Sequence, residues 1–160
     1  MRVSLPAAAT WSHLTSEPFL RMFSEEVGVE LHSIALQEQQ GQALATMDWS
    51  FLVDRPGMPE VARRMLPASV RMRWSQSWGP LSGDRATGQL DVALLGRPSA
   101  SSRGQCTLES DDLGSTLRTS TSTKTDLPFP VASRVESLID RDLVGWVLSV
   151  QARVLAQQVP

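Results

Sequence analysis

Apolar and polar residues alternate with a period of two through the middle of the chain. From Gln42 to Val53, the even-numbered Thr46, Asp48 and Ser50 oppose an apolar face. That face consists of Ala43, Ala45, Met47, Trp49, Phe51 and Val53. The segment from Val70 to Trp78 repeats the pattern, with Val70, Met72, Trp74 and Trp78 on one side. Such alternation predicts strands that bury one face.

Turn residues divide the rest of this region into further strands. Gly41, Gly79-Pro80, Gly96 and Gly114 stand where hairpins need them. The expected strands are Arg2 to Leu5, Glu30 to Glu38, Thr87 to Leu95, Ser99 to Ser110 and Ser115 to Thr125. The last two are rich in Ser and Thr, so a low-complexity loop is the alternative. Thr is a good strand former, which favours strands.

The end of the chain has a helical period instead. Apolar residues recur at intervals of three and four from Val131 to about Gln158, which predicts one long helix with an apolar face. Two short helices are expected near the start, Ala7 to Leu14 and a second that Ser16 caps and Gly28 ends. Another short helix is expected from Pro59 to Leu66.

This order of elements predicts an α+β fold in one domain, residues 1–160. A helix of this length cannot bury its apolar face alone, so it needs a wide, curved receiver. We therefore expect a helix-grip fold: a curved antiparallel sheet of about seven strands wrapped around the long C-terminal helix. The two short helices follow the first strand.

Composition and charge narrow the range of possible functions. The chain is 41% hydrophobic and 20% charged, with a net charge of −2, which gives no electrostatic case for nucleic acid or an anionic membrane. The longest apolar run, Leu143 to Val150, is too short to cross a membrane. Arg2 and Ala7 to Ala9 mimic parts of a signal peptide, but Pro6 breaks the apolar stretch. We expect a cytoplasmic protein.

The sequence offers little catalytic or metal-binding chemistry. Cys106 is the single cysteine and is expected to be a small buried residue on a strand. His13 and His32 are isolated from other metal-ligating residues, so no metal site and no cofactor are expected. Phosphate-binding loops, nucleophile elbows and paired carboxylates are missing from the sequence.

The expected inner face of the sheet is the first candidate site. Its large side chains are Met47, Trp49, Phe51, Met72, Trp74 and Trp78. Met suits irregular ligands and Trp offers flat surfaces, so these residues are candidates to line an apolar pocket. The alternative is that they pack against the terminal helix and leave no cavity.

The terminal helix carries two further candidates. A regular helical period places Asp142, Ser149 and Arg153 on the side of Trp146, so Asp142 and Ser149 are hypothesised to touch a hydrated cavity or ligand, with Gly145 giving room. The alternative for Asp142 is an edge position paired with a neighbour. On the opposite side a narrower stripe is a candidate homodimer contact, unless the first helices cover it. It consists of Val144, Leu148 and Leu155.

Four short motifs carry a family resemblance. They are Ser77 to Pro80, Thr87-Gly88, Leu127 to Pro130 leading to Val135 to Ile139, and Gly57 to Pro59 before a short helix. With the order of elements, they make the chain similar to the START-like helix-grip superfamily (SRPBCC), which includes polyketide cyclases and birch pollen allergen type proteins. More narrowly, the chain resembles an actinobacterial family of unknown function, DUF2505.

The resemblance spans nearly the whole chain and implies a fold with an enclosed pocket, usually for a lipid or another apolar molecule. It carries over no catalytic residue. We therefore expect a protein that binds a hydrophobic or amphipathic small molecule between sheet and helix, with Met58, Val61 and Met65 on a lid. The alternatives are a cyclase-like enzyme, for which acid–base groups are scarce, and an interaction module without a ligand.

Overall fold

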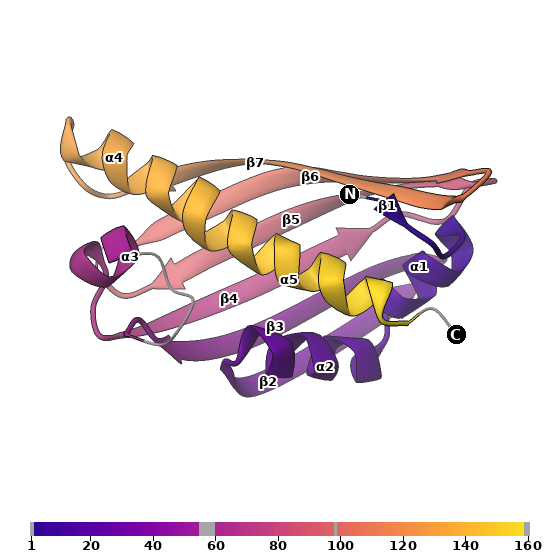
Figure 1. The fold of residues 1–160 in the computed structure, drawn as a ribbon, viewed down its shortest axis with the longest axis horizontal. Coiled ribbons are helices and arrows are strands. Elements are labelled where there is room, and N and C mark those ends of the chain that lie inside the picture. Colours follow the sequence, from indigo (N-terminus) through magenta and orange to yellow (C-terminus); the bar gives the residue numbers. More distant parts are fainter. Residues whose placement is uncertain (1, 55–59, 98, 159–160) are drawn as a thin grey trace.

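The computed structural model describes residues 2–54, 60–97 and 99–158, which form one antiparallel sheet and a set of helices on its inner face (Figure 1). The strands stand in the order β1-β7-β6-β5-β4-β3-β2. They are β1 (Arg2–Val3), β2 (Glu30–Gln39), β3 (Gln42–Leu52), β4 (Ser69–Trp78), β5 (Arg85–Leu95), β6 (Ala100–Asp111) and β7 (Gly114–Thr125). The predicted α+β fold with a seven-stranded sheet is confirmed.

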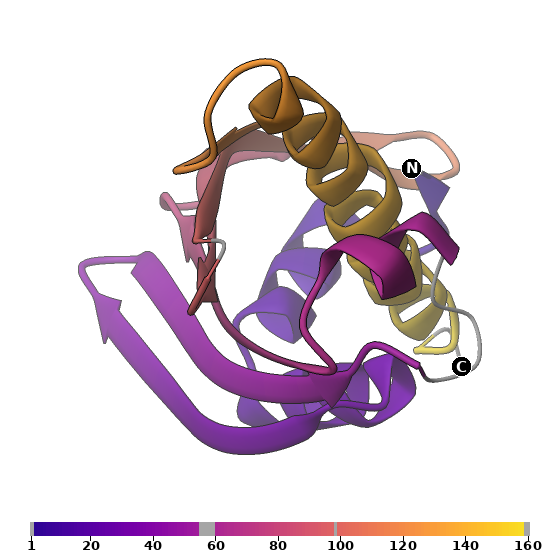
Figure 2. The ribbon, with the colours of Figure 1, turned by 90° about the vertical axis from the view of Figure 1, so that its left-hand side faces the viewer.

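Two short helices, α1 (Ala7–Leu14) and α2 (Glu17–Val27), follow β1, and α3 (Glu60–Met65) lies between β3 and β4. The chain ends in a continuous helix made of α4 (Val131–Leu138), a π-helical segment η1 (Ile139–Val144) and α5 (Gly145–Ala156). This terminal helix crosses the sheet diagonally, from β7 at α4 toward α2 at α5 (Figure 1). Seen from the end that carries α3, the sheet curls around it (Figure 2).

The two-residue alternation sets the inner face of the sheet. Met47 pairs with Trp74 and Trp49 with Met72, so large apolar side chains lie side by side on β3 and β4. The segments rich in Ser and Thr are strands, β6 and β7, paired over their whole length. Their inward positions include the buried Ser102, Ser115 and Thr123. The inner face is therefore apolar on β3 and β4 and partly polar on β6 and β7.

The starts and ends of the short helices are nearly as predicted. Gly28 ends α2 in the left-handed conformation, with φ of 68°. Ser16 occupies the N-cap position of α2, but its hydroxyl donates to the carbonyl of His13 and caps no backbone N–H of the helix.

The π-helical segment changes which residues of the terminal helix face the sheet. A π turn holds one residue more than an α turn, so every later residue is rotated by about one position. A regular period places Asp142, Trp146, Ser149 and Arg153 inward. Val150 and Val154 of the predicted apolar face are buried, but Asp142, Trp146, Ser149 and Arg153 are not; the other buried residues of this part of the helix are Leu143, Val144, Val147, Gln151 and Leu155.

Hydrogen bonds tie the first half of the terminal helix to β7. A carboxylate oxygen of Asp140 accepts from the hydroxyls of Thr121 and Thr123, at 2.7 and 3.1 Å. Glu136 accepts from the backbone N–H of Thr125 at 3.1 Å. Because β1 pairs with β7 only at Ser115 and Thr116, these side chains cover part of a strand edge that would otherwise be open.

Candidate functional site

The aromatic stripe of β3 and β4 packs mainly against α2. Phe23 lies edge-on to Trp49 and to Trp74, with ring centroids 5.4 and 5.9 Å apart, and the two tryptophans stack at 5.8 Å. The indole N–H of Trp49 donates to the hydroxyl of Ser24, also on α2, at 3.1 Å. All six predicted pocket residues are buried. This part of the stripe is tightly packed core.

A polar cluster lies next to this stripe, between β4 and α5. Gln151 on α5 donates from Nε2 to Oε1 of Gln76 on β4, at 2.9 Å, and both side chains are buried. Nε2 of Gln76 in turn lies 3.8 Å from Sγ of Cys106 on β6, and the Thr119 hydroxyl donates to the same sulfur at 3.5 Å. The cluster thus joins three strands to the terminal helix.

Three buried polar atoms around this cluster have no hydrogen-bond partner in the described structure. They are Nε1 of Trp74, Nε1 of Trp78 and Oε1 of Gln151. Trp74, Gln76 and Trp78 occupy successive inward positions of β4, so the two indoles flank Gln76. A buried donor or acceptor left without a partner costs about 1–3 kcal/mol, and such groups are few in native proteins.

The cluster is electrically neutral. Its titratable side chain is Cys106, and burial raises the pKa of that thiol above its ordinary value, against smaller opposing effects of Thr119 and Gln76. The thiol therefore stays protonated near neutral pH, and the prediction of a small buried residue on a strand is confirmed. Two indole donors and one amide acceptor remain for a neutral group with hydroxyl or carbonyl chemistry.

The predicted residues of the terminal helix do not join this cluster. Asp142 is partly exposed and pairs with its neighbour Arg141 at 2.9 Å, and hydrogen bonding to Arg141 lowers the pKa of its carboxyl below the ordinary value. This is the edge position named as the alternative. Ser149 is exposed and donates to the carbonyl of Trp146, which is half-buried. A Cβ on Gly145 would meet only ordinary contact, so close approach does not require glycine there.

The candidate dimer stripe is wrong as an exposed surface. Val144 and Leu155 are 1% and 0% exposed, and Leu148 packs half-buried against the core. The one-residue rotation at η1 and the contact of α5 with α2 bury this side of the helix.

The predicted lid falls partly outside the described residues. Met58 and the side chain of Val61 lie there, while Met65 is half-buried against the core at the end of α3. Helix α3 contacts α4 and η1, so it sits beside the first half of the terminal helix.

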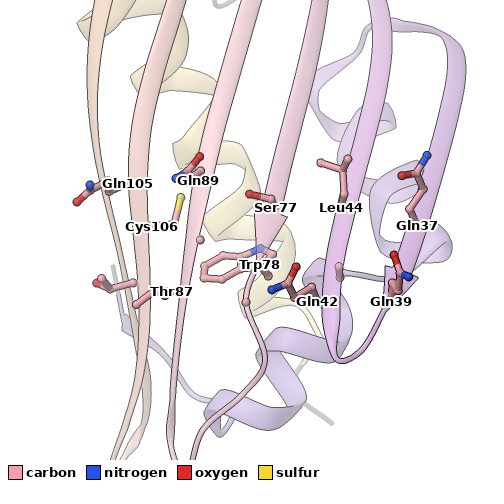
Figure 3. A pocket seen from close by; sticks show the side chains of 14 residues that line it. Gln37, Gln39, Gln42, Leu44, Ser77, Trp78, Thr87, Gln89, Gln105 and Cys106 are labelled. Carbon is pink, nitrogen blue, oxygen red and sulfur yellow. The ribbon is translucent and has the colours of Figure 1, made fainter.

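The two glutamines of the polar cluster lie away from the surface hollows, although Cys106 and Trp78 border one of them. One of about 650 Å³ opens on the outer face of the sheet, over β2 to β6, and Figure 3 shows it with the terminal helix behind the strands. Its polar lining is neutral: Gln37, Gln39, Gln42, Gln89, Gln105, Ser77, Thr87 and Thr107. Trp78 also borders it, and Asp142 borders a smaller hollow on the terminal helix. Neither Gln76 nor Gln151 lines any of the four hollows described.

Among the described residues, no three metal-ligating side chains are gathered where they could hold a metal ion. His32 lies on the exposed edge strand β2, with Nε2 2.8 Å from the hydroxyl of Ser50. No helix in the described part of the chain is long and apolar enough to cross a membrane.

Sequence reasoning missed Gln76 and Gln151 for different reasons. Gln76 had a signal, because it occupies the same alternation as Trp74 and Trp78 and breaks an otherwise apolar face. Gln151 had none, since it faces inward only after the rotation at η1.

The chain matches the family of proteins of unknown function DUF2505 over residues 1–157. Since the match covers nearly the whole chain, the protein belongs to this family. No curated protein matches the chain. The curved sheet with its long C-terminal helix is compatible with a helix-grip fold.

Proposed function

We propose that this protein binds a neutral amphipathic small molecule between the sheet and α5. The polar end of the ligand lies at Gln76 and Gln151, and its apolar body lies against Met72, Trp74 and Trp78. The helix-grip architecture is then used as in START-like proteins, with the ligand held between the sheet and the long helix.

The observation that carries this proposal is the set of three unpartnered atoms, Nε1 of Trp74, Nε1 of Trp78 and Oε1 of Gln151. A hydroxyl group suits either kind of atom, because its oxygen accepts from an indole N–H and its proton is donated to an amide oxygen. A carboxylate or an ammonium does not, since the cluster offers no opposite charge and burying an unpaired ion is costly. The ligand's polar end is therefore an alcohol, a phenol or a similar neutral group.

Binding also needs room, which the surrounding elements can supply. Since none of the hollows described is lined by Gln76 or Gln151, the ligand must displace packed side chains or move a helix to reach them. The π-helical segment η1 separates α4 from α5, and π segments are frequent at functional sites. We infer that α5 moves about this segment while Asp140 and Glu136 hold the first half of the helix to β7.

The proposal is binding and not acid–base catalysis. General acids and bases need a titratable group within reach of the substrate. The polar cluster offers only the Cys106 thiol, whose raised pKa keeps it neutral.

A pair of ligands with the same chain length tests the proposal. We expect 1-decanol to quench or shift the tryptophan fluorescence in a saturable way, whereas decanoate, which carries a charge, binds at least about tenfold more weakly. The Gln151→Met variant keeps the side-chain volume but removes the acceptor, so its affinity for decanol should fall about tenfold.

Ser149→Ala is the matched control, because Ser149 lies on the outer side of the same helix. It should bind decanol like the unmodified protein. Equal binding of decanol and decanoate, or an unchanged affinity in Gln151→Met, would overturn the proposal.

A further inference from the structure

The cations of this protein divide into two groups. Most arginines whose side chains are described form ion pairs, namely Arg2, Arg21, Arg64, Arg73, Arg85, Arg103, Arg118, Arg141 and Arg153. Four exposed cations form none with any described residue: Arg71, Arg97, Lys124 and Arg134.

All four unpaired cations lie at the end of the sheet that carries α3. Arg71 is near the start of β4 and pairs with Leu95, the last residue of β5. Arg97 follows β5, Lys124 is next to the last residue of β7, and Arg134 is in the first turns of α4. Figure 2 looks onto this end, where α3 and the start of the terminal helix face the viewer.

Exposed apolar side chains gather at the same end. Leu52 and Leu95 end β3 and β5, and Phe129 and Val131 form the turn from β7 into α4. Phe129 is 86% exposed and Leu52 60%, which is unusual for large apolar residues in one region of a surface. Together with the four cations, these side chains define the α3-end rim.

Acidic residues at this end offset only part of the charge of the rim: Asp54, Asp126 and Glu136 carry three negative charges against the four cations. Asp126 accepts from the backbone N–H of Ser99, Glu136 from that of Thr125, and Glu60 pairs with Arg64. Asp54 is the exposed acid there without such a bond in the described structure. The rim therefore keeps a small excess of positive charge, which an external anionic surface can meet.

We propose that the α3-end rim docks on the surface of an anionic lipid bilayer. Apolar side chains that enter the interface, ringed by cations that meet anionic headgroups, are the two attractions that hold a protein on such a surface. The net charge of −2 does not reveal this local excess of positive charge, because it sums the charges of the whole chain. The docking does not depend on the ligand proposed for the interior.

Vesicle flotation tests the docking. We expect the protein to float with phosphatidylcholine vesicles that contain about one third phosphatidylglycerol, and to remain behind with phosphatidylcholine alone. Binding should weaken steeply as salt is raised, because exposed charges are screened. The Arg97→Gln/Arg134→Gln double variant should lose binding by at least about tenfold.

Two matched controls separate the rim from general charge and hydrophobicity. Arg21→Gln/Arg118→Gln changes the net charge equally but removes paired cations, and it should float like the unmodified protein. Phe129→Ser should weaken binding about tenfold, whereas Leu113→Ser should not, although Leu113 is 69% exposed in the β6–β7 turn.

Absence of flotation with either vesicle, equal flotation with both, or equal loss in the two arginine double variants would overturn the docking. Decanol binding by the Phe129→Ser variant is measured alongside. Because Phe129 lies away from Gln76 and Gln151, that binding should be retained, so failure of the docking is distinguished from failure of the interior site.

Discussion

The two ends of the sheet differ in how their charges are used. At the end that carries the β6–β7 turn, Arg2 pairs with Asp111, and Glu109 lies between Arg85 and Arg118. At the end that carries α3, four described cations form no ion pair with a described residue and four large apolar side chains are exposed. At the first end the charged side chains pair with one another, whereas at the second end four cations and four apolar side chains are exposed to solvent. We call the first of these the fixed end and the second the α3 end.

The largest expected difference between the two ends is in how much stability is lost when a glycine with positive φ is replaced by alanine. Gly114 has φ of 140°, and a Cβ there would lie 2.2 Å from the carbonyl oxygen of Val3 on β1. Gly96 has φ of 126°, but a Cβ there would meet nothing within 4 Å. Gly114→Ala should lower the free energy of unfolding by about 3 kcal/mol or more. Gly96→Ala should lower it by about 1 kcal/mol, from backbone strain alone.

Urea unfolding of both variants measures this difference. Gly114→Ala must separate β1 from β7 to relieve the contact, so its loss should exceed that of Gly96→Ala clearly. Equal losses would mean that the fixed end is no more tightly built than the α3 end.

Acid should also destabilise the fixed end, but by less than the Gly114→Ala substitution does. Hydrogen bonding to Arg2 lowers the pKa of Asp111 below its ordinary value. A carboxyl with a lowered pKa in the folded state contributes stability above the pH where an ordinary aspartate titrates, about 4, and this is lost as the pH falls through the lower folded value. Arg2→Gln should therefore reduce the loss of stability between about pH 4 and pH 2.

Arg134→Gln is the comparison at the α3 end. Since Arg134 pairs with no described carboxylate, the acid dependence of its melting temperature should match that of the unmodified protein. Thermal melts over the same pH range measure both variants. An acid dependence that changes equally in both would show that Arg2 has no special role at its end.

Most of the fold could be predicted from the sequence because the strands obey a local rule. In β3 and β4 each apolar residue is two positions from the next, so face and register follow from counting. The long helix also follows from its period. The start of β5 and the end of β1 were each misplaced by two residues, which reflects turn geometry that polar residues leave ambiguous.

The candidate site was harder to predict because it depends on one extra residue in a helical turn. No residue type between Ile139 and Val144 marks a π turn, yet that turn brings Gln151 inward and carries Asp142 and Ser149 outward. The unpaired cations of the rim were also hidden, since pairing depends on which strands are neighbours. The composition gives only the total number of charged residues and does not show which of them pair.

The indole N–H groups offer the most direct test of the interior site. The chain has five tryptophans, and the indoles of Trp11 and Trp49 already donate within the protein, to Gly79 and Ser24. Those of Trp74 and Trp78 donate to no described residue. In a proton–nitrogen correlation spectrum, decanol should move the Trp74 and Trp78 indole protons downfield and leave those of Trp11 and Trp49 nearly unmoved. Saturable decanol binding with no selective movement of the Trp74 and Trp78 signals would contradict a ligand held at Gln76 and Gln151.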